Sequence, residues 1–256
     1  MGTVAEPETG SKSSDVVPRA TLSRWLTLWL PLGMLSAYLL GMLLVPSPSK
    51  LWRILIFSEL GIIELGTAGL YLATCVLALL VGLRLRGVPA RYRGMFIFVA
   101  AVALFICLEE TNYGQYFFDT EGSDWYSKHA KKKEINLHKM AGHMPARRMN
   151  AMASIAFPTW CLGLPLLGTW RKTWWSRGHW STYILPRLEL ALIVVLAQAM
   201  GWLDDLFRQC GWRMNVWARA SEFKELYWSL AAFLMAALLW RRLRYLRLPG
   251  SAGSRP

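Results

Sequence analysis

Residues Gly94 to Phe118 read GMFIFVAAVALFICLEETNYGQYFF. The fourteen residues from Met95 to Leu108 are all apolar, and as an α-helix they span about 21 Å. Because the hydrocarbon layer of a bilayer is about 30 Å thick, we expect Glu109 and Glu110 to lie inside the membrane and not at a free helix end. An ionisable side chain at that depth is costly unless it is paired, protonated or hydrated, which makes both glutamates candidate functional residues.

Five further apolar runs have the length that a transmembrane helix needs. The fourth run is the least regular, because Pro158 and Pro165 can kink it or make it re-entrant. We therefore predict an all-α integral membrane protein: a bundle of about six transmembrane helices within residues 22–240, flanked by a disordered polar tail at 1–21 and a basic tail at 241–256. The predicted spans are residues 24–45, 58–83, 94–118, 150–169, 184–207 and 222–240, with one long loop at 119–149.

The composition agrees with this class. Hydrophobic residues make up 54% of the chain and charged residues only 18%, against about 25% charged in soluble domains. A net charge of +13 would suggest nucleic acid in a soluble protein, but here the arginines flank apolar runs, so membrane lipids are the expected partners and nucleic acid is not. The four cysteines show no CxxC spacing and are expected to be small buried apolar residues: Cys75, Cys107, Cys161 and Cys210.

The distribution of charge predicts the orientation. With six spans both termini share one side, which carries sixteen of the Lys and Arg residues, while twelve of the sixteen acidic residues fall on the other side. Basic residues near span ends resist translocation, so we expect both termini in the cytoplasm and the long loop outside. Tryptophans at the cytoplasmic span ends, such as Trp170 and Trp240, are expected to be interfacial anchors.

Other acidic side chains fall on the same outward side as Glu110. Glu64 lies deeper in the second span than Glu59, and Asp204 and Asp205 end the fifth span, where acids oppose the helix dipole. Acids in a first helical turn favour the dipole, so the pair that begins the sixth span, Glu222 and Glu225, is expected to cap the helix or to form a solvated edge.

The long loop contains Glu134 and His138, four residues apart, which on a helix would share one face and could hold a cation or a proton. His143 is at the wrong spacing from His138 for a two-histidine metal face on a helix. The run from Lys131 to Lys133 is expected to be solvated or to bind lipid headgroups.

Three elements together resemble a group of uncharacterised bacterial multi-pass membrane proteins. These elements are the Glu64 segment of the second span, Glu109-Glu110-x-x-Tyr113-Gly114-Gln115, and Glu134-x-Asn136-Leu137-His138. Members carry Glu-Glu-x-x-Trp-Gly-Gln and Glu-x-Asn-Leu-His, and the likeness covers about residues 55–240. This chain departs from the pattern at Tyr113, where Trp is expected, and at Lys139, where Asn is expected. The resemblance implies that these positions work as a set, without implying a reaction.

The leading functional prediction is an outward-facing site with Glu64, Glu109, Glu110, Gln115 and His138 as candidate catalytic residues, acting on a lipid or another amphiphile. A carboxyl group that holds its proton more tightly than usual and the imidazole can serve as acid and base. No nucleophile motif of the G-x-S-x-G kind is present.

A divalent metal is one candidate cofactor, because carboxylates and imidazole bind such ions and activate water on them. Its predicted ligands are Glu110, His138 and Asp205. Two other classes stay open: a proton- or cation-coupled transporter, and an assembly subunit of a membrane complex in which the acids tie the spans together. The oligomeric state stays open.

Overall fold

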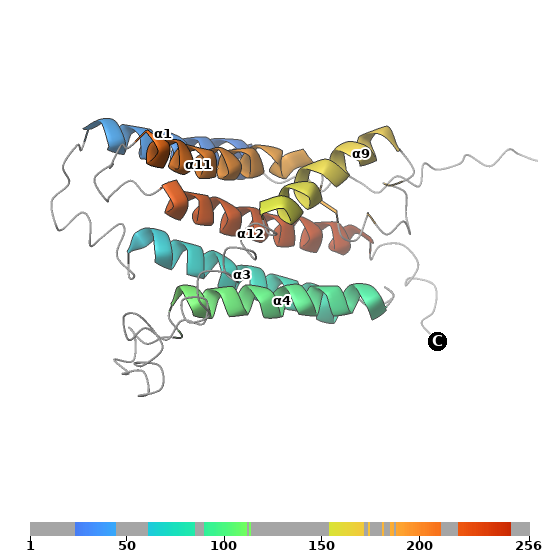
Figure 1. The fold of residues 1–256 in the computed structure, drawn as a ribbon. Helices are drawn as coiled ribbons and strands as arrows, with labels where there is room; N and C mark the ends of the chain where they lie inside the picture. Colours follow the sequence, from blue (N-terminus) through green and yellow to red (C-terminus); the bar gives the residue numbers. More distant parts are fainter. Residues whose placement is uncertain are drawn as a thin grey trace, which may run out of the picture.

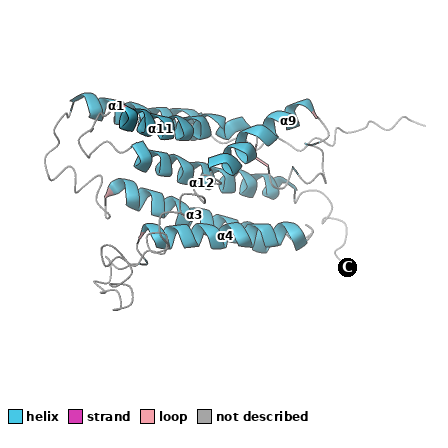
Figure 2. Cartoon of the chain, in the orientation of Figure 1, coloured by secondary structure: helices cyan, strands magenta, loops and turns pink. Residues whose placement is uncertain are grey.

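The computed structural model describes residues 24–44, 61–84, 90–111, 113, 154–171, 174, 181, 185–186, 188–210 and 220–246. Within these ranges all regular secondary structure is helical (Figure 2), which confirms the all-α prediction. The α-helices are α1 (Leu30–Leu44), α3 (Ile62–Arg84), α4 (Ala90–Glu110), α9 (Leu164–Trp170), α11 (Ala191–Gln209) and α12 (Ala220–Leu246). Short turns of other helix types precede three of them: η1 (Trp25–Trp29), η3 (Thr159–Gly163) and η5 (Leu188–Leu190).

Three of the described helices are, by length and composition, long and apolar enough to cross a membrane, as expected for a membrane protein. They cover Ile62–Arg84, Tyr92–Glu110 and Glu222–Arg242. Two shorter apolar helices, Trp25–Gly41 and Ala191–Leu203, coincide with the predicted first and fifth spans. Six spans therefore stay a prediction.

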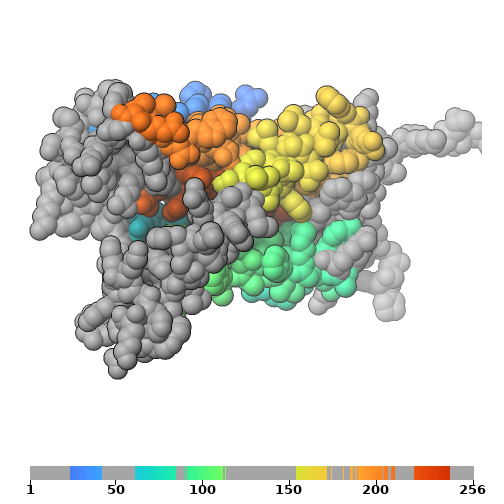
Figure 3. All heavy atoms as spheres, in the orientation of Figure 1, coloured from blue at the N-terminus to red at the C-terminus, as the bar shows by residue number. Residues whose placement is uncertain are grey.

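The helices form a stack in which α12 is central. One side of α12 packs against α3, which in turn packs against α4, and its other side packs against α11. Figure 1 shows the same order, with α1 and α9 on the α11 side of the stack. In the space-filling view of Figure 3, α11 and the η3–α9 segment lie next to each other along one face.

Two π-helical turns explain how helices with internal prolines stay continuous. Each turn ends two residues before a proline, η1 before Pro31 and η3 before Pro165. A proline lacks the N–H that its helix would use, and its ring pushes against the preceding turn. In each case the residue after the π-turn donates its N–H to the carbonyl five residues back, Leu30 to Trp25 and Leu164 to Thr159. The predicted fourth span is consequently a widened helix over residues 154–170, and its prolines do not break it.

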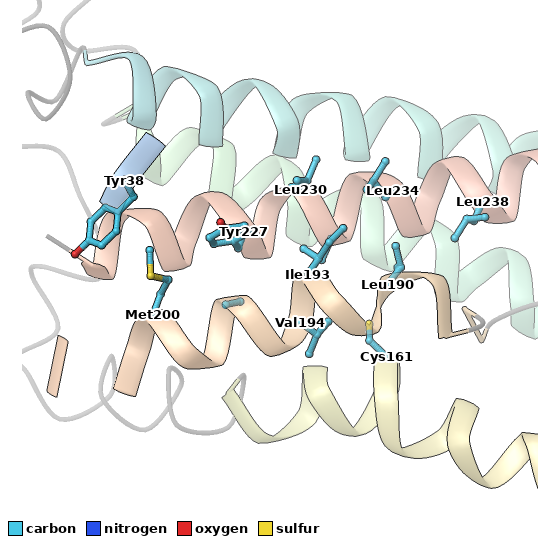
Figure 4. Close-up of a cluster of buried hydrophobic side chains, with 12 residues drawn as sticks. Tyr38, Cys161, Leu190, Ile193, Val194, Met200, Tyr227, Leu230, Leu234 and Leu238 are labelled. Carbon is cyan, nitrogen blue, oxygen red and sulfur yellow. The ribbon is translucent and has the colours of Figure 1, made fainter. Parts of the chain in front are cut away.

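The buried core lies between α12, α11, α1 and η3. Figure 4 shows apolar side chains of α11 and α12 meeting along their length, with Cys161 of η3 against α11 and Tyr38 of α1 near one end. The buried Tyr227 hydroxyl donates to the Pro31 carbonyl at 2.8 Å and so ties α12 to α1.

The cysteines are all free, and the prediction that they are buried is only partly right. Cys107 and Cys161 are buried and Cys75 is half-buried, whereas Cys210 is exposed. Cys210 follows the last residue of α11, where no described neighbour packs over the helix end.

Candidate carboxylate site

Four glutamates from three helices lie at one end of the bundle. α3 begins, α4 ends and α12 begins at this end, the left end in Figure 1. Glu64 lies in the first turn of α3 and Glu110 is the last residue of α4. We call Glu64, Glu110, Glu222 and Glu225 the carboxylate cluster.

Electrostatic interactions connect the members of the cluster. Glu225 interacts with Glu110 most strongly, then with Glu222 and Glu64, and all three carry its own sign of charge, while its neighbour Lys224 opposes them. Tyr71 of α3 lies within electrostatic range of both Glu110 and Glu225. Repulsion among like charges is relieved when such a group holds a proton or a cation.

The two acids that begin α12 divide the roles that the sequence predicted. A helix cap or a solvated edge was expected for both; α12 starts at Ala220, so only Glu222 lies in its first turn, while the exposed Glu225 fits a solvated edge. Glu225 lies one turn further along, is exposed, and is within electrostatic range of Glu110 of α4. A helix-dipole role therefore fits Glu222 only.

Tyr71 was not identified by sequence reasoning. Glu64, Thr67 and Tyr71 follow the three-to-four-residue spacing of one helix face, and Thr67 is buried. This spacing could have identified Tyr71 as a neighbour of Glu64. A tyrosine within an apolar run carries no charge, however, and so does not stand out as a candidate site residue.

Glu109 has a different partner from the cluster. It is buried, with 6% of its surface exposed, and the Tyr113 hydroxyl donates to its Oε1 at 2.5 Å. Tyr113 has a φ of 55°, a left-handed conformation that few residues other than glycine adopt. The chain thus turns directly after α4, and the Tyr113 ring folds back onto Glu109.

This geometry corrects the predicted third span, which was expected to continue to Phe118 with Glu109 and Glu110 inside it. α4 ends at Glu110. The Thr111 hydroxyl and N–H both donate to the Cys107 carbonyl, at 3.0 and 3.1 Å, and satisfy a group that the ending helix would leave open.

Two arginines, Arg84 at the end of α3 and Arg242 near the end of α12, lie at the opposite end of the bundle. The Arg84 guanidinium lies 5.2 Å from the Trp240 ring centroid, a cation–π contact between the ends of α3 and α12. Arg242 is buried and donates to the Leu185 carbonyl at 2.8 Å. Trp240, expected to be an interfacial anchor, therefore also holds an arginine in place.

The predicted metal site is not assembled by the described part of the chain. Asp205 lies exposed near the end of α11, while Gln115 and His138 lie outside the described residues, as do Glu59 and Glu134. Among the described residues no group of three or more His, Cys, Asp and Glu side chains is placed to hold a metal ion. The ligand set Glu110, His138 and Asp205 stays a prediction.

Comparison of the chain with protein-family models, with curated proteins and with solved structures found no match.

Proposed function

We propose that the chain is a six-span protein of the bacterial inner membrane, with both termini in the cytoplasm and the carboxylate cluster at the outer surface. Three membrane-length helices and two shorter apolar ones support the spans. The separation of glutamates at one end from Arg84 and Arg242 at the other supports the orientation, because basic residues stay on the cytoplasmic side. The likeness to the uncharacterised bacterial family is part of this proposal.

The proposed activity is acid–base chemistry on the headgroup of a lipid or another amphiphile. The observation that carries it is the electrostatic interaction of Glu110 with Glu225, two glutamates from different membrane-length helices. A proton held by this pair is available to a headgroup, and the pair in its charged form can accept one. Glu64 and Tyr71 surround the pair, while Gln115 and His138 are proposed to complete the site from the segment after α4.

Glu109 takes a positioning role in this proposal. Its carboxylate accepts the Tyr113 hydroxyl, so it fixes where the chain leaves α4. The direction of that exit determines where Gln115 can lie relative to Glu110. A divalent metal held by Glu110, His138 and Asp205 is a variant of the same proposal in which the ion supplies activated water.

The test compares purified full-length wild type with Glu110→Gln, Glu225→Gln and the double variant. Each protein is incubated with a total phospholipid extract, and lipid species are quantified by mass spectrometry while bound metal is measured by elemental analysis. We expect the wild type to convert a lipid species and both single variants to lose at least tenfold in rate. Glu189→Gln is the matched control, because Glu189 lies in η5, away from the cluster.

Wild type that leaves every lipid species unchanged would contradict the chemistry. If Glu110→Gln alone loses the folded protein in size-exclusion chromatography, the glutamate is a structural tie and the assembly-subunit function is favoured instead.

A second candidate is proton- or cation-coupled transport. It is favoured because the glutamates of the carboxylate cluster come from three different helices. Glutamates from three membrane-length helices meet at one end, as in proteins that move ions through helix bundles. Reconstituted vesicles with a pH-sensitive dye distinguish the two candidates. Transport predicts a proton flux that Glu225→Gln abolishes and that needs no change in lipid composition.

A further inference from the structure

A small buried cluster marks the place where α3, α4 and α12 meet at the end of the bundle opposite to the carboxylate cluster. Its members are Val81, Phe96 and Leu239. At this end, the right end in Figure 1, α3 and α12 end and α4 begins. Arg84 lies three residues after Val81, and Arg93 lies three residues before Phe96. Each arginine therefore shares a helix face with a residue of the buried cluster.

Two contacts show that the arginines of the three helices lie at one level. The Arg84 guanidinium lies 5.2 Å from the Trp240 ring centroid, so it lies against α12, in which the next residue is Arg241. A Cβ at Gly82 would lie 3.5 Å from the Arg93 carbonyl oxygen, so the backbones of α3 and α4 approach closely two residues before Arg84. We call Arg84, Arg93 and Arg241 the arginine group.

The segments around the arginine group carry only positive charge. Residues 80–98 and 236–248 together contain eight arginines and no aspartate or glutamate. The short helix η5, which contains Glu189, packs on the other side of α12, where α11 lies. A surface that gathers one sign of charge attracts counter-ions, so the arginine group favours an anion.

An anion can reach the arginine group at the surface of the bundle. Arg84 and Arg241 are exposed and Arg93 is half-buried, so the ligand needs no cavity. Arg242 differs from them, because it is buried and donates to the Leu185 carbonyl.

The exposed side chains beside the arginine group define the class of anion. Leu83, Ile97 and Phe98 are exposed and belong to helices of membrane length, so they offer an apolar surface next to the charge. A phospholipid matches both features, because its phosphate lies at the level of helix ends and its acyl chains lie along the helices. A soluble anion would leave the apolar side chains uncovered. Arginine forms paired hydrogen bonds with phosphate, and basic sites between transmembrane helices bind lipid headgroups.

We propose that the arginine group binds the phosphate of an anionic glycerophospholipid, whose acyl chains lie along the exposed apolar side chains of α3 and α4. The site does not depend on the chemistry proposed for the carboxylate cluster, which lies at the other end of the bundle. It requires only that α3, α4 and α12 lie in a membrane.

The test uses two lipids that have the same acyl chains and differ in the charge of the headgroup. Dioleoyl phosphatidylglycerol is anionic and dioleoyl phosphatidylcholine is zwitterionic. Titration of the purified full-length protein in an uncharged detergent, followed by native mass spectrometry, measures the affinity for each. We expect wild type to bind the anionic lipid about tenfold more tightly or more, because each arginine near a lipid phosphate contributes about fivefold.

A matched pair of double variants separates the site from the overall charge. Arg84→Gln with Arg93→Gln should weaken binding of the anionic lipid by about fivefold or more. Arg24→Gln with Arg171→Gln removes the same charge from two exposed arginines, one before η1 and one after α9, and should keep the wild-type affinity. Arg84→Gln alone, at an exposed position, should still weaken binding if the double variant fails to fold.

Equal affinity of wild type for the two lipids overturns the proposal, and this comparison needs no variant to fold. Equal losses in the two double variants also overturn it, because the attraction then comes from the net charge of the protein. Soluble glycerophosphoglycerol at the concentration of the lipid should not displace the bound lipid. Displacement would show that the arginines bind a phosphate group alone, and would overturn the assignment to a lipid.

Discussion

A close contact between α3 and α4 at Gly82 predicts opposite effects for two glycine-to-alanine substitutions in the same helix. A Cβ at Gly82 would lie 3.3 Å from Ile97 Cγ1, 3.4 Å from Phe96 Cβ and 3.5 Å from the Arg93 carbonyl oxygen. A Cβ at Gly69 would meet nothing within 4 Å. Gly69 lies inside α3 and Gly82 lies in its last turn, so the gain in helix propensity is at most as large at Gly82 as at Gly69, and a larger loss of stability at Gly82 reports packing.

The magnitude follows from two opposing terms. Alanine in place of glycine in a helix interior gains about 0.5–1 kcal/mol, which is the whole effect expected for Gly69→Ala. At Gly82 a gain of at most this size is opposed by crowding against α4, where added methyl groups in packed sites cost about 1–3 kcal/mol. Gly82→Ala is therefore expected to be less stable than Gly69→Ala by about 1–3 kcal/mol.

Thermal unfolding of the purified protein, followed by size-exclusion chromatography of the fraction that stays folded, measures this difference. For a chain of this size 1 kcal/mol corresponds to about 2–4 °C in Tm, so the two variants should differ by several degrees, with Gly69→Ala at or above wild type. Equal Tm values for the two variants would refute the close α3–α4 contact at Gly82. A higher Tm for Gly82→Ala would show that the contact accepts a methyl group.

Three further predictions test single interactions and the topology. Tyr227→Phe removes the buried hydrogen bond to the Pro31 carbonyl and should lower stability by about 1 kcal/mol; an unchanged Tm would mean that this bond does not tie α1 to α12. Tyr113→Phe removes the donor to Glu109, a bond to an acidic group worth about 1.5–3 kcal/mol, and limited proteolysis should then cut sooner after α4 than in wild type. Gly122→Cys, in a background without the native cysteines, should react in whole cells with a membrane-impermeant maleimide, and labelling only after the cells are opened would reverse the proposed orientation.

The class of fold could be read from local patterns. Runs of apolar residues such as Met95–Leu108 are long enough that only a helix in a membrane satisfies both their side chains and their backbone. The bounds of α3 and α12 follow the predicted second and sixth spans, although α12 extends past the predicted end at Trp240 to Leu246, while α4 ends at Glu110 and not at Phe118. Arg242 in this added segment is buried, and its guanidinium donates to the Leu185 carbonyl, a contact that the sequence does not predict.

The local backbone conformation at the candidate site was harder to predict from the sequence. A left-handed residue at Tyr113 ends the third helix early, and nothing about a tyrosine predicts that conformation. Pro158 and Pro165 were expected to disturb the fourth span, but whether a proline breaks, kinks or widens a helix depends on the packing around it. Here η3 is held against α11 and the helix widens.

By itself the sequence determined that the chain is helical and belongs in a membrane, and it determined that Glu64, Glu110 and Glu225 fall at one end, because consecutive spans alternate in direction. Only the tertiary structure decided which of these acids interact. Glu225 and Glu110 come within electrostatic range because α4 and α12 both pack on α3, and the buried indole N–H groups of Trp160 and Trp228 could be identified only after their neighbours were placed. Hydrophobicity is a property of each segment, whereas a contact between side chains depends on helix rotation and order, which arise from packing across the whole bundle.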